Sequence, residues 1–177
     1  MQILGQVNLL HTRVRPEIDV ARLLERLVAK QLPGRRGLEA WQALLRAHAT
    51  LLRQLERDLE KQTGLALADF DVLAQLAVAG GELRMSELAD RALISRSGMT
   101  RRIARLVEVG LVRRANAGAD ARGIVVALTD AGVARLKETA PVHARGIADL
   151  FVARLDAREL AALKSALDKV TLDCGFG

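Results

Sequence analysis

The sequence has few aromatic residues, few prolines and a single cysteine. Its 177 residues include no tyrosine, one tryptophan, three phenylalanines, three prolines and one cysteine. A single cysteine, Cys174, excludes a disulfide framework within the chain and fits a reducing compartment. Because proline interrupts helices whereas the abundant leucine, alanine, arginine and glutamate favour them, the composition predicts a mainly α protein.

Long apolar runs are also missing. No uninterrupted run approaches the roughly 20 residues that a membrane-spanning helix needs. The first residues lack the charged segment and apolar stretch of a secretory signal. Half of the residues are hydrophobic and 27% are charged, which is enough to bury a core as one domain, with or without appended helices. We therefore expect a soluble, cytoplasmic globular protein with no membrane partner.

Positive charge is concentrated in one stretch of the chain. The formal net charge is +6, and residues 84 to 123 hold nine arginines against four acidic residues. A localised basic surface attracts polyanions and binds phosphates without regard to sequence. Nucleic acid is therefore the expected partner, and an anionic membrane surface is the competing interpretation.

Apolar spacing predicts helices on both sides of this basic stretch. Residues 16–32 form the first pattern, which Pro33-Gly34 ends, and a basic turn at 35–37 separates it from a long amphipathic helix over 38–64. A further helix covers 67–79, before Gly80-Gly81. After the basic stretch, Thr129 caps a long helix in which Pro141 is a candidate point of interruption. A last helix covers about 156–172, and its residues expected to point inward are Leu160, Leu163, Leu167 and Val170.

Within the basic stretch, two helical patterns are joined by a tight turn around Leu93 and Ile94. Ser95 is placed to cap the second helix, and Gly110 is placed to end it. At 100° per residue, one side of this helix is apolar and the other is rich in arginine. The apolar side holds Met99, Ile103, Leu106 and Val107, and the opposite side holds Ser97, Arg101, Ala104, Arg105 and Glu108.

This second helix has the features of a DNA-recognition helix. Arginine can pair with O6 and N7 of guanine in the major groove, so Arg101 is the main candidate for base readout, followed by Ser97 and Thr100. Ser95 leaves the N–H groups at the positive end of the helix facing a phosphate. Considered alone, an arginine-rich helix can also be merely solvated. The residues expected to contact phosphates are Arg96, Arg102 and Arg105.

Two short strand patterns follow and flank a loop, Asn116-Ala-Gly-Ala-Asp120. Arg122 lies on the far side of this loop, where a hairpin tip can place a guanidinium in a narrow minor groove. Asp120 is expected to orient a nearby arginine, because a carboxylate would repel phosphates. Together these elements predict a winged helix-turn-helix DNA-binding module with a small β-wing.

The order of motifs resembles the MarR family of winged helix-turn-helix transcription regulators over roughly Leu38 to Val170. The most specific similarity is the stretch from Asp120-Ala-Arg122 to Leu128-Thr129-Asp-Ala-Gly132, and the segment Ser95-x-Ser97-x-x-Thr100-Arg101 also matches. The resemblance implies a homodimer that binds a pseudo-palindromic operator in double-stranded DNA. It further implies a repressor that a small aromatic or anionic effector releases.

The same resemblance divides the chain into parts with different roles. Residues 65–128 are the winged helix-turn-helix module, and 38–64 and 129–174 are dimerisation helices. Residues 1–37 depart from the family pattern and are an N-terminal extension with one amphipathic helix, for which an extra dimer helix and a start-site artefact are the alternatives. Trp41, His48 and Phe70 are candidates to line an effector pocket, although packing in the core or the dimer interface is the competing interpretation.

Other classes of function have little support in the sequence. The three histidines and the cysteine are scattered without metal-ligand spacing, so we expect no metal or other cofactor. The sequence shows no serine, histidine and aspartate in the order of a catalytic triad. It also shows no glycine-rich phosphate-binding loop and no paired acids in a polar cleft pattern, which argues against an enzyme. The alternatives to a regulator are a winged-helix protein-interaction module and a sequence-indifferent architectural DNA-binding protein.

Overall fold

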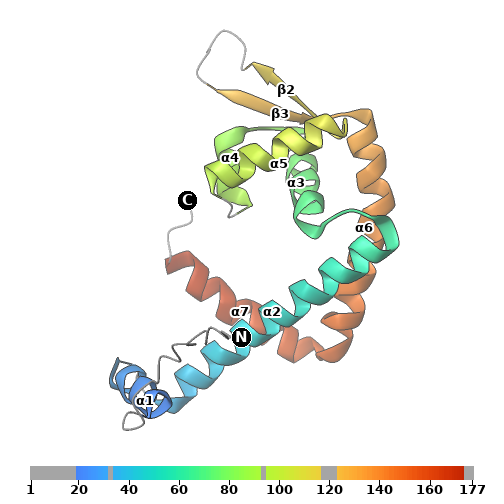
Figure 1. Ribbon diagram of the computed structural model, residues 1–177. Helices are drawn as coiled ribbons and strands as arrows, with labels where there is room; N and C mark the ends of the chain where they lie inside the picture. The colour runs from blue at the N-terminus through green and yellow to red at the C-terminus, as the bar shows by residue number, and fades with distance from the viewer. Residues whose placement is uncertain (1–18, 32–33, 93–94, 117–122, 174–177) are drawn as a thin grey trace, which may run out of the picture. The chain divides into compact units, whose positions relative to one another are not determined.

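The computed structural model describes residues 19–31, 34–92, 95–116 and 123–173. The chain divides into two compact units, residues 1–48 and 49–177, which we describe separately. In chain order, the elements are α1 (Val20–Gln31), α2 (Arg35–Thr63), α3 (Leu67–Val78), β1 (Glu82–Arg84), α4 (Met85–Arg91), α5 (Arg96–Glu108), β2 (Val112–Asn116), β3 (Ile124–Leu128), α6 (Asp130–Leu150), a 3₁₀ helix η1 (Val152–Arg154) and α7 (Ala157–Asp173) (Figure 1).

The first unit holds α1 and the first half of α2. The expected basic turn at residues 35–37 is wrong, because these residues form the first turn of α2. Gly34, directly before α2, adopts a left-handed φ of 90°, a conformation that glycine takes without steric cost. Arg35 then pairs with Glu39 one turn ahead, at 2.8 Å, so arginine acts here as a helix former.

The core of the second unit surrounds α3, which packs against α4, α6 and the sheet. Leu73 and Leu76 of α3 are fully buried, and Leu59 reaches the same cluster from the end of α2. The other large, fully buried apolar side chains come from α3 itself, from the helix-turn-helix and from the sheet. They are Val72, Leu88, Met99, Ile103, Leu106, Val112 and Val126.

The three strands form one antiparallel sheet in the order β1-β3-β2. Val126 of β3 lies opposite Leu83 on one side and Arg114 on the other. The hairpin of β2 and β3 confirms the two predicted wing strands. β1 was not predicted, since three residues are too few to show the alternation of a strand.

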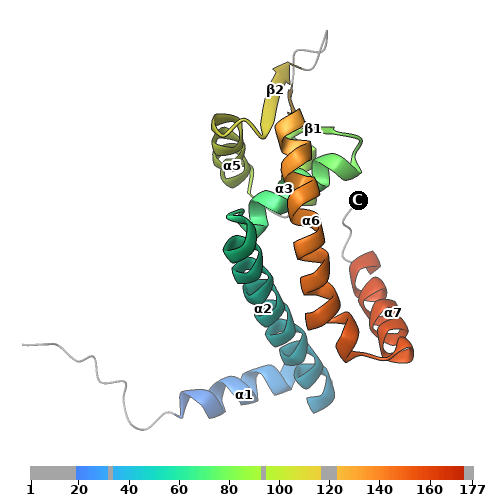
Figure 2. The same ribbon diagram turned by 90° about the vertical axis from the view of Figure 1, so that its right-hand side faces the viewer.

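Helix α6 leads away from the sheet, and η1 and α7 follow at its far end (Figure 1, Figure 2). The predicted cap is confirmed, because the Thr129 hydroxyl accepts a hydrogen bond from the N–H of Gly132 at 3.0 Å. Pro141 does not interrupt α6. Proline removes a single backbone hydrogen bond, and its exposed position leaves the freed carbonyl open to water.

Candidate nucleic-acid interface

Helix α5 has the cap, the end and the buried face that the sequence predicted. The Ser95 hydroxyl accepts a hydrogen bond from the N–H of Gly98 at 3.2 Å, and Gly110 follows the helix with a φ of 74°. Met99 and Ile103 are fully buried, which fixes the opposite side of the helix outward. Val107 lies at the margin of the apolar side and remains 37% exposed. The predicted turn at Leu93 and Ile94 lies outside the described residues.

The outward side of α5 presents polar and cationic groups to solvent. Ser97, Arg101 and Arg105 are exposed, as the 100° spacing predicted. Thr100 is also exposed, and its hydroxyl donates to the carbonyl oxygen of Arg96 at 2.9 Å, which leaves oxygen lone pairs available outward. A groove of about 310 Å³ runs along this surface and is lined by Gly98, Arg101, Arg102 and Arg105.

Two of the predicted phosphate-binding arginines are held by an acidic residue of α3. Arg102 Nη1 donates to Asp69 Oδ1 at 2.6 Å, and Arg105 Nη2 donates to both carboxylate oxygens at 2.6 Å. Asp69 is buried, at 6% exposure. The sequence analysis missed it, although one signal was present: Asp69 precedes Leu73 and Leu76 by four and seven residues, which places an acid on the apolar stripe of α3.

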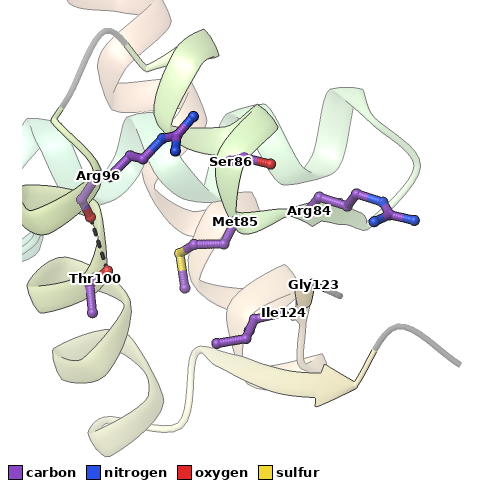
Figure 3. Close-up of a pocket in the computed structure, with 7 residues that line it drawn as sticks. All are labelled: Arg84, Met85, Ser86, Arg96, Thr100, Gly123 and Ile124. Carbon is purple, nitrogen blue, oxygen red and sulfur yellow. Dashed lines mark hydrogen bonds between the residues drawn. The ribbon is translucent and has the colours of Figure 1, made fainter. Parts of the chain in front are cut away.

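A second cationic cleft, of about 300 Å³, lies beside α5 (Figure 3). Arg96 and Thr100 line it from α5, whereas Arg84 lines it from the end of β1. Gly123 also lines it and lies close to Arg84, because a Cβ at position 123 would be 3.2 Å from Arg84 Nη1. The sequence analysis did not single out Arg84. The remaining lining residues are Met85, Ser86 and Ile124.

The wing is described at its strands but not at its tip. Arg113 and Arg114 of β2 are exposed, and Arg114 Nη2 donates to the carbonyl oxygen of Thr100 at 3.4 Å, which links the wing to α5. Asp120 and Arg122 lie outside the described residues, so their predicted roles stay predictions.

The three candidates for an effector pocket lie in different surroundings. Phe70 is buried in the core, with its ring centroid 4.6 Å from that of His143 on α6. Partial burial lowers the pKa of His143, while the nearby Asp71 carboxylate acts in the opposite direction. Burial raises the pKa of Asp71, although His143 and Arg102 oppose that shift. Trp41 is 55% exposed and His48 is exposed; both lie on α2 in the first unit.

Within the described ranges, no three histidine, cysteine, aspartate or glutamate side chains gather where they could hold a metal ion. In the same ranges, every helix is too short or too polar to cross a membrane.

Comparison with known proteins agrees with this geometry. Residues 63–123 match a sequence model described as the MarR family. Comparison with curated proteins gives no significant match. Among solved structures, the chain is similar to AbsC, a MarR family transcriptional regulator from Streptomyces coelicolor. The identity is 30%, the alignment covers 81% of this chain and 97% of that one, and the TM-score is 0.75.

Two further similar structures were determined with DNA. Sco3205, a MarR family transcriptional regulator from Streptomyces coelicolor in complex with DNA, is 32% identical, with 76% of this chain and 84% of that one covered and a TM-score of 0.71. A mutant of MarR from E. coli, complexed with operator DNA, is 26% identical, with 76% and 95% covered and a TM-score of 0.68. Identity of 30% or more over most of both chains, together with the winged helix-turn-helix fold, shows that this chain belongs to the MarR family of transcriptional regulators.

Proposed function

We propose that this protein is a homodimeric repressor that binds a pseudo-palindromic operator and leaves it when a small effector binds. One observation carries the DNA-binding part of this proposal: α5 is capped by Ser95, buried on its apolar side, and turns Arg101 and its neighbours outward. The solved relatives in complex with DNA support the same role.

The proposal gives the predicted residues distinct tasks. Arg101 pairs with a guanine in the major groove, with Ser97 and Thr100 beside it. Arg96 contacts a phosphate near the positive end of α5. At the wing, Arg122 enters the minor groove and Asp120 orients an arginine. We add Arg84 to the phosphate contacts, because it lines the cationic cleft that Arg96 also lines.

Arg102 and Arg105 contribute less to phosphate binding than Arg96 and Arg84, because both are paired with Asp69. Arg102 is only 25% exposed, and Asp69 neutralises part of its charge. Arg105 is 56% exposed, so it reaches solvent while it holds the same carboxylate. Arg105 is therefore the better phosphate contact of the two.

The decisive experiment compares specific and random binding. The operator is isolated by selecting DNA fragments that wild-type protein retains, and affinities are measured by fluorescence anisotropy. A regulator prefers its operator over random DNA by about 10³-fold or more at physiological salt. A protein-interaction module or an architectural DNA-binding protein shows no such preference.

Within that experiment, Arg101→Ala tests base readout. The variant should lose about 1–3 kcal/mol of operator binding and relax the preference at one base position. Arg154→Ala is the matched control, because η1 follows α6 at the end opposite the sheet, about 30 Å along the helix. Equal loss of operator and random binding in Arg101→Ala would refute base readout by this residue.

Dimerisation is supported by apolar side chains that a single chain leaves exposed. Leu167 and Val170 of α7 are 37% and 60% exposed, and Leu44 of α2 is 39% exposed. Leu51 and Leu163 are partly buried. We place Leu44, Leu51, Leu163 and Leu167 in or near the subunit contact, with residues 38–64 and 129–174 as the dimerisation helices and 65–128 as the DNA-binding module.

The effector is proposed by class only, as a small aromatic or anionic molecule, with Trp41, His48 and Phe70 as candidate pocket residues. A panel of aromatic acids and phenols tests this, with release of labelled operator as the readout. Release by one compound, weakened in Trp41→Ala, supports the pocket. An operator complex that no compound disturbs argues against this class of effector.

A further inference from the structure

We propose that Asp69 is a positioning residue for DNA recognition. By holding Arg102 and Arg105, its buried carboxylate sets the orientation of α5 and raises the preference for the operator over random DNA. This inference rests on the proposed function, because it concerns how the recognition helix reads DNA.

The contacts join two elements that are distant in the sequence. Asp69 lies in the first turn of α3, while Arg102 and Arg105 lie 33 and 36 residues later on α5. The three hydrogen bonds are all 2.6 Å long, as expected for charge-assisted pairs. One carboxylate thus ties two points of α5, about one helical turn apart, to the first turn of α3.

Because the Asp69 carboxylate is buried, both arginines must stay within hydrogen-bonding distance of it. A carboxylate that is 6% exposed is costly unless hydrogen bonds and opposite charge compensate for the lost water. Here the compensation comes from two arginine side chains on one helix. A rotation of α5 about its axis would separate at least one of them from Asp69, so the carboxylate opposes that rotation.

The orientation of α5 matters because Arg101 adjoins Arg102 in the sequence. Successive residues of a helix point about 100° apart, so fixing the Arg102 direction also fixes the direction in which Arg101 leaves the helix. Arg101, Arg102 and Arg105 line the same groove of about 310 Å³. Asp69 therefore orients the arginines that line the groove, while its own carboxylate is buried away from DNA.

Electrostatic repulsion and the proposed positioning role predict opposite changes in operator affinity when this carboxylate is removed. Asp69→Asn removes a negative charge beside two arginines, so electrostatics alone predicts tighter binding to any DNA. If Asp69 positions α5, the operator affinity falls instead, while random DNA binds as well as before or better. The ratio of the two affinities separates these cases.

The experiment measures operator and random DNA binding of Asp69→Asn over a range of salt concentrations. Circular dichroism first establishes a temperature at which every variant is fully folded. The ratio of operator to random affinity is expected to fall by about tenfold, comparable to the loss of one base contact. The random-DNA salt slope should stay the same or steepen, because Arg102 and Arg105 lose their acidic partner.

Asp90→Asn is the matched control. Asp90 is an exposed acid of α4 within the same basic stretch, and no hydrogen bond or ion pair of its carboxylate is seen among the described residues. Its replacement should raise operator and random binding together and leave their ratio unchanged. The same parallel rise in Asp69→Asn would overturn the positioning role.

Asp69→Glu keeps the inference testable if Asp69→Asn does not fold. Glutamate retains the charge but moves the carboxylate outward by one methylene, so the salt slope should stay at the wild-type value while the affinity ratio falls. An unchanged ratio in a folded Asp69→Glu variant would also count against the proposal. A wild-type protein with no operator preference would instead refute the proposed function itself.

Discussion

At the scale of single residues, Arg84 lies where the end of β1 meets the cleft beside α5. A guanidinium there that contacts a phosphate would displace about one counterion, without reading a base. We expect Arg84→Ala to weaken operator and random DNA binding by the same factor and to reduce the salt slope by about 1. Anisotropy titrations at several salt concentrations, with Arg154→Ala as the control, measure both quantities. A loss confined to the operator would contradict the phosphate contact.

The lowered pKa of His143 makes the stability of the folded protein depend on pH. Burial against Phe70 lowers the pKa of His143 from its ordinary value of 6.5. Just below pH 6.5 the unfolded chain therefore binds more protons than the folded chain, and the free energy of unfolding falls as the pH is lowered. Asp71 acts in the opposite direction and at lower pH, because burial raises its pKa above 3.8.

Urea unfolding at about pH 7.5 and about pH 5.5 checks the His143 effect. We expect wild-type stability to be lower at the acidic pH and His143→Gln to lose most of that difference. His48→Gln should keep it, because His48 is exposed. A wild-type difference that persists in His143→Gln would show that another group is responsible.

Gly132 shows how closely two elements approach at the start of α6. A Cβ at this position would overlap the carbonyl oxygen of Leu111 and lie 3.1 Å from its carbonyl carbon. Backbone cannot move aside as a flexible side chain can, so Gly132→Ala should destabilise the protein by about 3 kcal/mol. In Gly37→Ala the new Cβ meets nothing within 4 Å, and helix propensity should raise stability by about 0.5–1 kcal/mol. Thermal unfolding at one protein concentration compares the two variants.

At the scale of secondary-structure elements, one hydroxyl joins the end of α5 to the start of α6. Thr129 Oγ1 donates to the carbonyl oxygen of Gly110 at 2.6 Å and accepts from the N–H of Gly132 at 3.0 Å. Thr129→Val removes both hydrogen bonds at nearly constant volume and should lower the free energy of unfolding by about 1–2 kcal/mol.

Thr171→Val is the matched control for Thr129→Val. Among the described residues, the hydrogen bonds of the Thr171 hydroxyl go to carbonyl oxygens of its own helix, those of Leu167 and Asp168. Its loss should change stability by less than about 0.5 kcal/mol, as for most surface substitutions. If both variants lose the same stability in urea unfolding, the hydroxyl of Thr129 does not join the two helices in the way we describe.

The elements that the sequence predicted well are those with long apolar periods and clear ends. Helix α5 was predicted with its cap at Ser95 and its end at Gly110, because thirteen residues show a period and both ends carry a chemical signal. β1 was missed, because its pairing with β3 depends on residues more than forty positions away. The predicted turn at residues 35–37 was wrong, because two arginines followed by a glycine resemble a turn in the sequence but begin α2 in the structure.

The candidate site was predictable to a similar extent. The outward face of α5 follows from its period, so the exposure of Arg101 was correctly predicted. The ion pairs of Arg102 and Arg105 were not, since a helix period shows which way a side chain points but not which residue of another helix meets it. Arg84 was missed for the same reason: the cleft exists only where β1, α4, α5 and β3 come together.

At the scale of the whole molecule, α7 leaves apolar side chains exposed that a second subunit would cover. In a dimer, carboxylates at Leu167 and Val170 would be buried without partners, so the double variant Leu167→Glu, Val170→Glu should sediment as a monomer at micromolar concentration. It should also lose operator affinity, because two recognition helices are needed for two half-sites. Lys169→Glu, on the same helix, should remain a dimer. A wild-type protein that is itself monomeric would contradict the proposed assembly.

The pairing of β1 with β3 also makes the helix-turn-helix and the wing strand β2 an exchangeable segment. Arg84 and Val125 are opposite each other in neighbouring strands, so the segment between them, which holds α4, α5 and β2, begins and ends at points about 5 Å apart. A segment whose two ends are adjacent can be replaced without moving the flanking chain, provided that its buried side chains still fit the core around α3. A chimaera joined at these two residues would take new DNA-contacting residues from a relative, while α2, α6 and α7 kept their own sequence.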